Sequence, residues 1–250
     1  MKKPPRNRCV RCKHDFTVTS GTLFADTHKP LRLWFEAIWD LSNQKSGASA
    51  LGLQRTLGLG SYRTAWNWLH KLRRAMVRPG RDRLSGVVEV DEAFIGGVHS
   101  GKRGRGAAGK SLVMIAAEAA GKKVGRIRMV RVADASAASL LPAIAQSIEP
   151  GTMIHTDGWR AYGGLKDLGY GHKAIRHTNE LGENLLPKIN LTVSLLKRWL
   201  LGTLQGAVRA NHLDYYLDEF TFRFNRRTSK SRGLLFYRLL QNAVVRDPVR

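Results

Sequence analysis

Apolar residues recur with two different spacings along this chain, and the change of spacing divides it into two parts. Between Trp34 and about Met76, apolar residues repeat every three or four positions, which is the spacing of one face of an α-helix. From Val87 onward, short apolar runs of strand length take over. The segment 78–83 between the two parts combines proline, glycine and charged residues, and it is predicted to be a linker.

The first part predicts one helix at 34–41 and two more across 49–76, separated by the turn 58–61. Ser61 at the end of this turn is a suitable N-cap for the second of the pair. Two helices joined by a glycine-bearing turn are typical of a helix-turn-helix DNA reader, and a plain helical hairpin is the alternative. If the second helix reads DNA, the side chains expected to contact it are Arg63, Asn67, His70 and Lys71.

The second part predicts three consecutive strands, followed by helix, strand, helix, strand and helix. This is the order of elements in an RNase H-like fold. We therefore expect an α/β protein with an RNase H-like mixed sheet flanked by helices, preceded by a small all-α module. The predicted strands lie at 87–90, 112–117, 124–132, 153–156 and 173–175, the helices at 135–147 and 162–168, a loop at 177–188, and a long helical region after it.

The net positive charge of the chain favours a negatively charged binding partner, such as nucleic acid. There are 42 Lys and Arg residues against 19 Asp and Glu, a formal net charge of +23, and the basic residues occur in nearly every segment. Such a field attracts phosphate backbones through counterion release, although a basic soluble or ribosome-associated protein is an alternative. No apolar run approaches 18 residues, and no signal peptide or basic amphipathic helix is evident, so we expect a cytoplasmic protein without a membrane partner.

Two acidic residues each follow a short apolar run. Asp91 follows the run 87–90, and Asp157 follows the run 153–156. In the predicted element order these two strands lie side by side, so the two carboxylates would converge and hold two Mg²⁺ ions for phosphoryl transfer. Taken singly, Asp91 could be a turn residue and Asp157 a helix cap. Glu92 would point to the other side of its strand and is interpreted as structural.

The segment 104–111 matches the G-x-x-x-x-G-K-[ST] phosphate loop letter for letter. That loop leaves a strand directly and opens a helix, whereas here the following residues 112–115 are typical of a strand. We therefore favour a basic hairpin loop close to nucleic acid and keep a P-loop nucleotidase as an alternative. In the favoured interpretation, the loop residues that contact DNA are Arg103, Arg105 and Lys110.

The only two cysteines, Cys9 and Cys12, form a Cys-x-x-Cys pair. A structural zinc site needs four ligands, and the chain has no second cysteine pair. His14 or His28 could add a ligand, although neither has the usual spacing. The pair is similar to the second knuckle of a zinc ribbon without its first knuckle, so a partial Zn²⁺ site is left open. A redox function is less favoured because no thioredoxin-like unit surrounds the pair.

Several longer segments resemble bacterial insertion-sequence transposases of the ISXO-like group. The resemblance extends from about residue 9 to about residue 243 and implies a zinc ribbon, a helix-turn-helix and an RNase H-like DDE domain. It further implies that the protein cuts and joins double-stranded DNA, at terminal repeats and at a target, with Mg²⁺ or with Mn²⁺ as a substitute. A homo-oligomer on DNA, associated with the nucleoid, is also implied. The segments are VEVDEAFIGG (88–97), HTDGWRAY (155–162), SLLKRWLLGT (194–203), HLDYYLDEF (212–220) and RFNRR (223–227).

The resemblance also implies a third catalytic position, occupied by Glu, Asn or His, with a lysine seven residues later. Asn190 and Lys197 match this pattern. Asn190 offers one neutral oxygen where glutamate would offer a charged carboxylate, and it can still bind Mg²⁺. Lys197 would contact substrate phosphate. The alternative is that Asn190 caps a helix and Lys197 is a solvated cation, in which case Glu180 or Glu183 would take the third role.

We therefore expect three domains: a partial zinc-ribbon-like knuckle at 1–25, a helix-turn-helix module at 26–80, and a catalytic domain with a helical extension at 81–250. The expected function is Mg²⁺-dependent DNA transposition, with Asp91 and Asp157 bridging the metal ions and Asn190 binding one of them. A catalytically inactive protein that binds terminal repeats is the main alternative.

Overall fold

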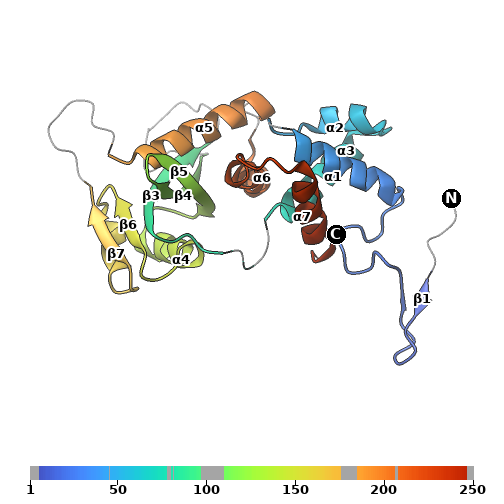
Figure 1. Ribbon diagram of the computed structural model, residues 1–250, viewed down its shortest axis with the longest axis horizontal. Coiled ribbons are helices and arrows are strands. Elements are labelled where there is room, and N and C mark those ends of the chain that lie inside the picture. Colours follow the sequence, from blue (N-terminus) through green and yellow to red (C-terminus); the bar gives the residue numbers. More distant parts are fainter. Residues whose placement is uncertain are drawn as a thin grey trace. The chain divides into compact units, whose positions relative to one another are not determined.

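The computed structural model describes residues 6–44, 46–77, 80, 82–96, 110–175, 185–205 and 208–246. The chain forms two compact units (Figure 1). The first unit comprises residues 1–78 together with 229–250, and the second comprises residues 79–228. Among the described residues, no helix combines the length and the hydrophobicity needed to span a bilayer.

The first unit is helical, with a short hairpin near its start. The three helices predicted between residues 34 and 76 are confirmed, and a fourth from the end of the chain packs against α1 and α3. The described elements are β1 (Asn7–Arg8), which pairs antiparallel with β2 (Asp15–Phe16), and the helices α1 (Leu31–Asn43), α2 (Ala50–Leu57), α3 (Tyr62–Ala75) and α7 (Arg232–Val244).

Stacked tryptophans form the centre of the first unit. The rings of Trp34 on α1 and Trp68 on α3 stack with centroids 3.8 Å apart, and both side chains are buried. The indole N–H of Trp34 donates to Thr27 Oγ1 at 2.9 Å, so its polar atom is also satisfied. Buried Arg73 near the end of α3 donates to the carbonyl oxygen of Ala48, just before α2, at 3.0 Å. These contacts hold α1, α2 and α3 in one packed group.

The residues at the ends of α2 and α3 are typical helix-capping residues. The Ser49 side chain accepts a hydrogen bond from the Gly52 N–H at the start of α2. Gly58 ends α2 with φ 60°, in the left-handed region that favours glycine. Ser61 occupies the N-cap position of α3 as predicted, although its side chain makes no capping hydrogen bond.

The second unit contains a five-stranded mixed sheet in the order β5-β4-β3-β6-β7. The first three strands along the chain form antiparallel neighbours, and β3, β6 and β7 run parallel. The predicted order of elements is therefore confirmed. The elements are β3 (Val87–Ile95), β4 (Ser111–Ala120), β5 (Lys123–Val132), α4 (Ala137–Ser147), β6 (Met153–Thr156), the 3-10 helix η1 (Arg160–Leu165), β7 (Gly171–Ala174), α5 (Pro187–Leu204), the 3-10 helix η2 (Ala210–His212) and α6 (Leu213–Asn225).

The two faces of this sheet pack against different helices. Val88 and Val90 of β3 belong to a core that includes residues of α4 and η1. Ala93 and Ile95, on the opposite face of the same strand, belong to a core that includes residues of α5 and α6. Figure 1 shows α5 and α4 on opposite sides of the sheet. Because side chains alternate along a strand, the odd-numbered positions of β3 face α5.

Several predicted elements have other bounds in the structure; β7, for example, is Gly171–Ala174 where 173–175 was predicted, and α5 begins at Pro187, within the predicted loop 177–188. β3 continues to Ile95, so Asp91 lies within a strand and does not end it, because Ala93 and Ile95 are buried on the α5 face. The parallel pairing of β3 with β6, however, stops at Glu89 opposite His155. The helix predicted around 162–168 is the 3-10 helix η1 at Arg160–Leu165, where two consecutive glycines disfavour a longer α-helix.

The last helix lies in a different unit from the one expected. The sequence assigned residues 229–250 to the catalytic domain, whereas α7 packs against α1 and α3. Leu239 and Ala243 are fully buried there, and the Asn242 side chain donates to the carbonyl oxygen of Ala75 at 2.9 Å. The apolar stripe of α7 fits any helical surface, so the sequence pattern does not reveal which one it covers.

Candidate active site

The parallel pairing of β3 and β6 brings the two predicted aspartates to neighbouring parts of the sheet. Glu89 lies opposite His155 in this ladder. Asp91 follows two residues later on β3, on the same face as Glu89 because side chains alternate along a strand, and Asp157 comes directly after Thr156, the last residue of β6. Neighbouring strands lie about 4.8 Å apart. The Asp91 side chain therefore leaves β3 on the face covered by α5, and Asp157 follows the end of the neighbouring strand.

Backbone N–H groups orient both carboxylates. Asp91 Oδ1 accepts from the Glu92 N–H at 2.8 Å, and Asp157 Oδ1 accepts from the Trp159 N–H at 2.9 Å. Trp159 is held in turn by its indole N–H, which donates to the carbonyl oxygen of Ala135 at 2.9 Å. The simpler interpretation of Asp157 as the cap of the following helix is therefore wrong, because the N-cap of η1 is Trp159, and Asp157 forms a local turn instead.

A buried tyrosine lies close to the same acidic residues. The hydroxyl of Tyr162, which is fully buried, donates to Glu92 Oε1 at 2.6 Å. Burial raises the pKa of Tyr162, the charge of Glu92 and its hydrogen bond raise that pKa further, and Asp91 and Asp157 add smaller contributions of the same sign. Three carboxylates are therefore within electrostatic range of one hydroxyl, and negative charge is concentrated at this edge. Glu92 has a partner in the structure that suits the structural role expected of it.

The start of α5 is attached to this face of the sheet. Glu89 Oε2 accepts hydrogen bonds from the Lys188 N–H at 2.8 Å and the Ile189 N–H at 3.0 Å. Asn190 follows directly on the helix and is exposed. Since Glu89 and Asp91 share a face of β3, the first turn of α5 begins two residues from Asp91 along the strand direction. The structure therefore brings Asn190 to the same region as the aspartate pair.

The alternative role of Asn190 as a helix cap is wrong. α5 begins with Pro187, and its N-cap is Leu186. Asn190 lies inside the first turn, where its own N–H bonds to the carbonyl oxygen of Leu186 at 2.9 Å. The cap interpretation placed the N-cap of the helix four residues too late. Proline at the first helical position, which is common there, is the sequence signal for the true start.

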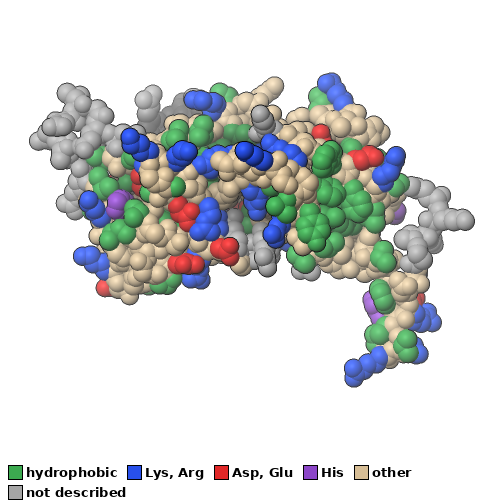
Figure 2. Space-filling model, viewed as in Figure 1, with side chains coloured by type: hydrophobic (Ala, Val, Ile, Leu, Met, Phe, Trp, Pro, Cys, Tyr) green, Lys and Arg blue, Asp and Glu red, His purple; other side chains and the backbone are tan. Residues whose placement is uncertain are grey.

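Lys197 lies two helical turns after Asn190, on the same exposed side of α5. Figure 2 shows Lys and Arg side chains gathered on the surface over α5. The exposed residues of this helix include both polar and apolar side chains. They are Pro187, Asn190, Leu191, Ser194, Lys197, Arg198, Leu201 and Gly202.

Oxygen donors dominate the group of residues that could hold a metal ion. Within the described part of the chain, no cluster of three or more His, Cys, Asp or Glu residues could hold one. The two aspartates with the side-chain oxygen of Asn190 would offer an all-oxygen donor set, which suits a hard cation such as Mg²⁺. The reserve candidates Glu180 and Glu183 lie outside the described residues.

The cysteine pair occupies a tight turn between β1 and β2. The Cys9 N–H donates to the carbonyl oxygen of His14 at 2.8 Å, and the Lys13 N–H donates to that of Cys9 at 2.9 Å. Hydrogen bonds from the backbone and side chain of Cys12 lower the pKa of Cys9, which favours the thiolate form. The two thiols thus converge as in one half of a zinc site. Among described residues, neither His14 nor His28 completes a cluster of three ligands.

The predicted DNA-reading residues on α3 separate into two groups. Arg63 and Asn67 are exposed and Lys71 is half-buried, and their spacing of four residues puts them on one side of the helix. His70 is instead buried and packs against the Trp66 ring, with centroids 4.0 Å apart. The expectation that His70 faces outward is therefore wrong, because it lies on the packed side of α3.

The phosphate-loop motif is followed by a strand. Residues 101–109, which include Arg103 and Arg105, lie outside the described residues, and Lys110 is half-buried. The residues after the motif form β4, as predicted from their apolar pattern. Because a phosphate loop opens a helix, the structure removes the main support for a P-loop nucleotidase.

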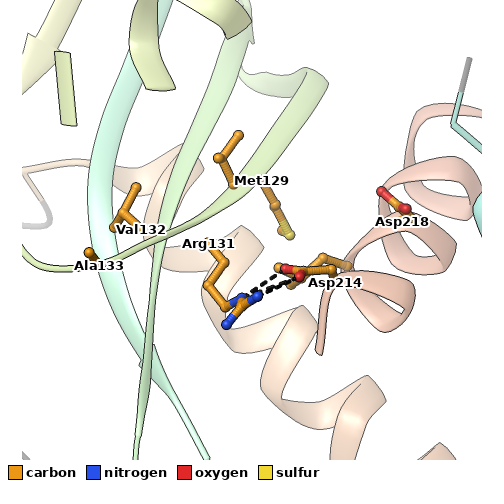
Figure 3. Close-up of a pocket in the computed structure, with 8 residues that line it drawn as sticks. Met129, Arg131, Val132, Ala133, Asp214 and Asp218 are labelled. Carbon is orange, nitrogen blue, oxygen red and sulfur yellow. Dashed lines mark hydrogen bonds and ion pairs between the residues drawn. The ribbon is translucent and has the colours of Figure 1, made fainter. Parts of the chain in front are cut away.

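A cavity of about 410 Å³ lies in another part of the second unit, between β5 and α6. Figure 3 shows Arg131 and Asp214 facing each other there, with Arg131 Nη2 and Asp214 Oδ2 2.8 Å apart. β4 separates β5 from β3 in the sheet, so this cavity is not part of the aspartate site. The ion pair with Arg131 compensates the charge of Asp214.

Sequence reasoning missed Glu89, the acid of this region that binds the start of α5. It stands between Val88 and Val90, both of which are fully buried. A charged residue in the middle of a buried apolar run needs a partner, because burying an unpaired charge is costly. That rule could have marked Glu89, although not the helix that supplies its partners.

Comparisons with known proteins agree on one family. Residues 83–225 match the ISXO2-like transposase domain. The chain is 25% identical over 239 residues to an uncharacterized protein in transposable element ISH50 of Halobacterium salinarum, covering 87% of this chain and 78% of that one. It is also 27% identical over 122 residues to an uncharacterized transposase-like protein of Haemophilus influenzae, covering 48% of this chain and 98% of that one.

Two solved structures are more distantly similar. One is a simian T-cell lymphotropic virus intasome in complex with PP2A regulatory subunit B56 gamma, with TM-score 0.35, 16% identity, and coverage of 80% of this chain and 72% of that chain. The other is a pre-cleavage Mos1 transpososome, with TM-score 0.33, 11% identity, and coverage of 87% and 81%. Both TM-scores are too low to support a fold assignment. The assignment of the fold therefore depends on the strand topology described above.

Proposed function

The chain belongs to the family of ISXO2-like transposases, and from that premise we propose that it is the DNA transposase of an insertion sequence. Its second unit would be the RNase H-like catalytic domain, with Asp91, Asp157 and Asn190 as metal ligands. The main support is the parallel pairing of β3 with β6, which puts Asp91 of β3 near the end of β6, where Asp157 follows. The attachment of α5 beside them supports the choice of Asn190.

The reaction would proceed in two transfers. Water attacks a phosphodiester at the end of the element, the bond from phosphorus to the 3′ oxygen breaks, and a 3′-OH is released. That 3′-OH then attacks a phosphodiester of the target DNA, joining the element end to the target and releasing a new 3′-OH. When bound, Mg²⁺ supplies the charge that activates the attacking oxygen and stabilises the leaving one.

The side chains of the site would have three roles: metal binding, orientation of the metal ligands, and contact with DNA. Asp91 and Asp157 offer charged oxygens, so they are suited to bridge two metal ions, while Asn190 offers one neutral oxygen to one ion. The backbone N–H groups of Glu92 and Trp159 hold the two aspartates in fixed orientations. Lys197, two turns along α5, would contact a DNA phosphate.

The first unit would recognise the ends of the element. The exposed side of α3 carries Arg63 and Asn67, with Lys71 one turn further, and such a helix can enter a major groove. The net charge of +23 would strengthen binding to any DNA. We further propose that the protein acts on double-stranded DNA as a homo-oligomer in the cytoplasm. Cys9 and Cys12 would be two of the four ligands of a zinc site, the other two being unassigned.

An assay for DNA nicking tests the proposed function. The wild-type protein is incubated with DNA that carries the ends of the element, with Mg²⁺, with Mn²⁺ or with a chelator. Cleavage at the element ends that requires the metal, followed by joining to a target plasmid, is expected. Cleavage that persists in the chelator would exclude the metal-dependent mechanism.

A second candidate function is a catalytically inactive protein that binds terminal repeats. The neutral Asn190 at the third position favours it, because Asn190 adds no negative charge to the metal site, whereas a glutamate would. In the same assay, specific binding to the element ends without any cleavage in Mg²⁺ or Mn²⁺ would support this candidate.

A further inference from the structure

Glu89 is a buried acid with an unusual environment. Its side chain is 5% exposed, and its neighbours Val88 and Val90 are fully buried. A carboxylate in such surroundings is stable only when hydrogen bonds or opposite charge compensate for its lost hydration. Its partners therefore show what the residue does.

The partners of Glu89 are the first free N–H groups of a helix. One oxygen, Oε2, accepts from both Lys188 and Ile189, the second and third residues of α5. The first N–H groups of a helix have no partner within the helix, and that end of the helix dipole is positive. Neither the N-cap residue Leu186 nor any acid in the first turn provides a local cap. A carboxylate 99 residues away in sequence does so instead.

Glu89 also stands beside the proposed metal ligands. It is two residues from Asp91 on the same face of β3, and it lies opposite His155 in the ladder with β6. Burial and then the charge of Lys173 lower the pKa of His155, while the charge of Glu89 acts in the opposite direction, so these two side chains interact electrostatically. Asn190 follows directly after the two N–H groups that Glu89 accepts.

We propose that Glu89 is a positioning residue, whose carboxylate fixes the first turn of α5 against β3 so that Asn190 meets Asp91 and Asp157. This rests on the proposed function, since it assumes that these three residues act together. Glu89 does not touch the substrate in this role. It joins a strand that carries one proposed ligand to a helix that carries another.

Glu118 provides a matched control in the same sheet. Its carboxylate also accepts two backbone N–H groups, those of Ser85 at 3.1 Å and Arg126 at 3.0 Å. Glu118 lies on β4, and its partners do not belong to α5. Glu118 is half-buried and also forms an ion pair with Arg126. Removing it should therefore cost at least as many hydrogen bonds without disturbing the helix that carries Asn190.

The test compares Glu89→Ala, Glu89→Gln and Glu118→Ala with the wild-type protein. Two properties are measured: the affinity for Mn²⁺ by electron paramagnetic resonance, and the rate of end cleavage at saturating DNA. Glu89→Ala is expected to weaken both by about 10- to 100-fold, as is typical when a residue that orients metal ligands is removed. Glu89→Gln keeps an accepting oxygen and should recover most of the loss. Equal losses in Glu89→Ala and Glu118→Ala would reduce Glu89 to a general stabilising residue and overturn the proposal.

A double-mutant comparison tests the link to Asn190. In an Asn190→Ala background, Glu89→Ala should cause little further loss, because the positioned group is already absent. A full additional loss in that background would show that Glu89 acts through something else, and the proposal would be overturned.

Hydrogen exchange separates this proposal from the proposed function. Glu89→Ala should speed exchange of the Lys188 and Ile189 amides, whereas Asp91→Ala and Glu118→Ala should not. If the wild type neither binds Mn²⁺ nor cleaves DNA while these amides behave as expected, the proposed function fails and Glu89 only anchors the helix. Unchanged exchange in Glu89→Ala would overturn the anchoring role itself.

Discussion

The acids on the two sides of the central strand β3 have different kinds of partner. On the antiparallel side and on α6, acidic side chains pair with arginines, with N···O distances of 2.6 to 2.8 Å. On the parallel side, acidic side chains accept hydrogen bonds from backbone N–H groups and from a tyrosine hydroxyl. The pairs with arginine are Glu118–Arg126, Asp214–Arg131 and Glu219–Arg223.

This difference separates acids that stabilise the fold from acids suited to chemistry. An arginine neutralises a carboxylate and satisfies its oxygens, which suits a structural role. A backbone N–H orients a carboxylate without cancelling its full charge. The parallel side of the sheet therefore includes carboxylates that backbone N–H groups orient, in a protein that is otherwise strongly basic.

The largest expected effect comes from removing an aspartate on the parallel side. Asp91→Ala or Asp157→Ala should lower metal-dependent strand transfer by more than about 100-fold, since loss of a metal ligand exceeds the loss of a residue that orients one. DNA binding, measured by gel shift, should stay intact. Asp214→Ala, which removes an acid that pairs with Arg131, serves as the control. Full strand transfer by either aspartate variant would remove that residue from the site.

Asn190 should give the next largest effect, and its direction depends on the substitution. Asn190→Glu should retain or raise activity, because it adds a charged oxygen at the same position. Asn190→Ala should lose most of the activity in Mg²⁺ and recover part of it in Mn²⁺, which accepts less regular oxygen coordination. The measurement is the cleavage rate of the wild type, Asn190→Glu and Asn190→Ala, each in Mg²⁺ and in Mn²⁺. Unchanged cleavage by Asn190→Ala would transfer the third role to Glu180 or Glu183.

A smaller effect is expected from Lys197. If it contacts a DNA phosphate, Lys197→Ala should weaken DNA binding about equally for all sequences and lower the slope of log affinity against log salt by about one. Lys122, in the turn between β4 and β5, provides a matched lysine on the antiparallel side. Equal slopes for Lys197→Ala and Lys122→Ala would show that Lys197 is a solvated cation.

The smallest effect concerns Glu118, and it depends on pH. Burial alone would raise the pKa of Glu118, but hydrogen bonds from the Arg126 side chain and from the Ser85 and Arg126 N–H groups outweigh it and leave the pKa lowered. Its contribution to stability is therefore present above the pKa of the unfolded chain and is lost as the pH falls through the lowered pKa of the folded state. Glu118→Gln should cost roughly 1–2 kcal/mol in urea unfolding at pH 7 and much less at pH 3. An equal cost at both pH values would contradict the ion-pair interpretation.

The order of the elements could be predicted from sequence because it depends on local periodicity. The strand at 153–156 was located with its observed ends, and the helices of the first unit follow their apolar spacing. β3 was predicted too short because Asp91 and Glu92 interrupt its apolar run, although the positions beyond them are buried. Single polar residues within a strand are therefore weak markers of its end.

Long-range contacts could not be predicted in this way. In the sequence, α7 is 150 residues or more from the helices that it covers. Its apolar stripe does not indicate which helices these are. Glu89 caps a helix that starts 98 positions later, and the sequence marks it only as a charge within a buried run. The aspartate pair could be predicted because both residues follow apolar runs whose order fixes their neighbours in the sheet.

The most direct test of the central claim is the binding of Mn²⁺ by the wild type, Asp91→Asn and Asp157→Asn, followed by electron paramagnetic resonance. Asparagine keeps the size of the side chain and removes its charge, so folding should be little changed. If the aspartates of the parallel side hold the metal, the wild type binds Mn²⁺, Mg²⁺ competes for the site, and each variant binds at least about tenfold more weakly. Mn²⁺ affinity that is the same in all three proteins would contradict the account.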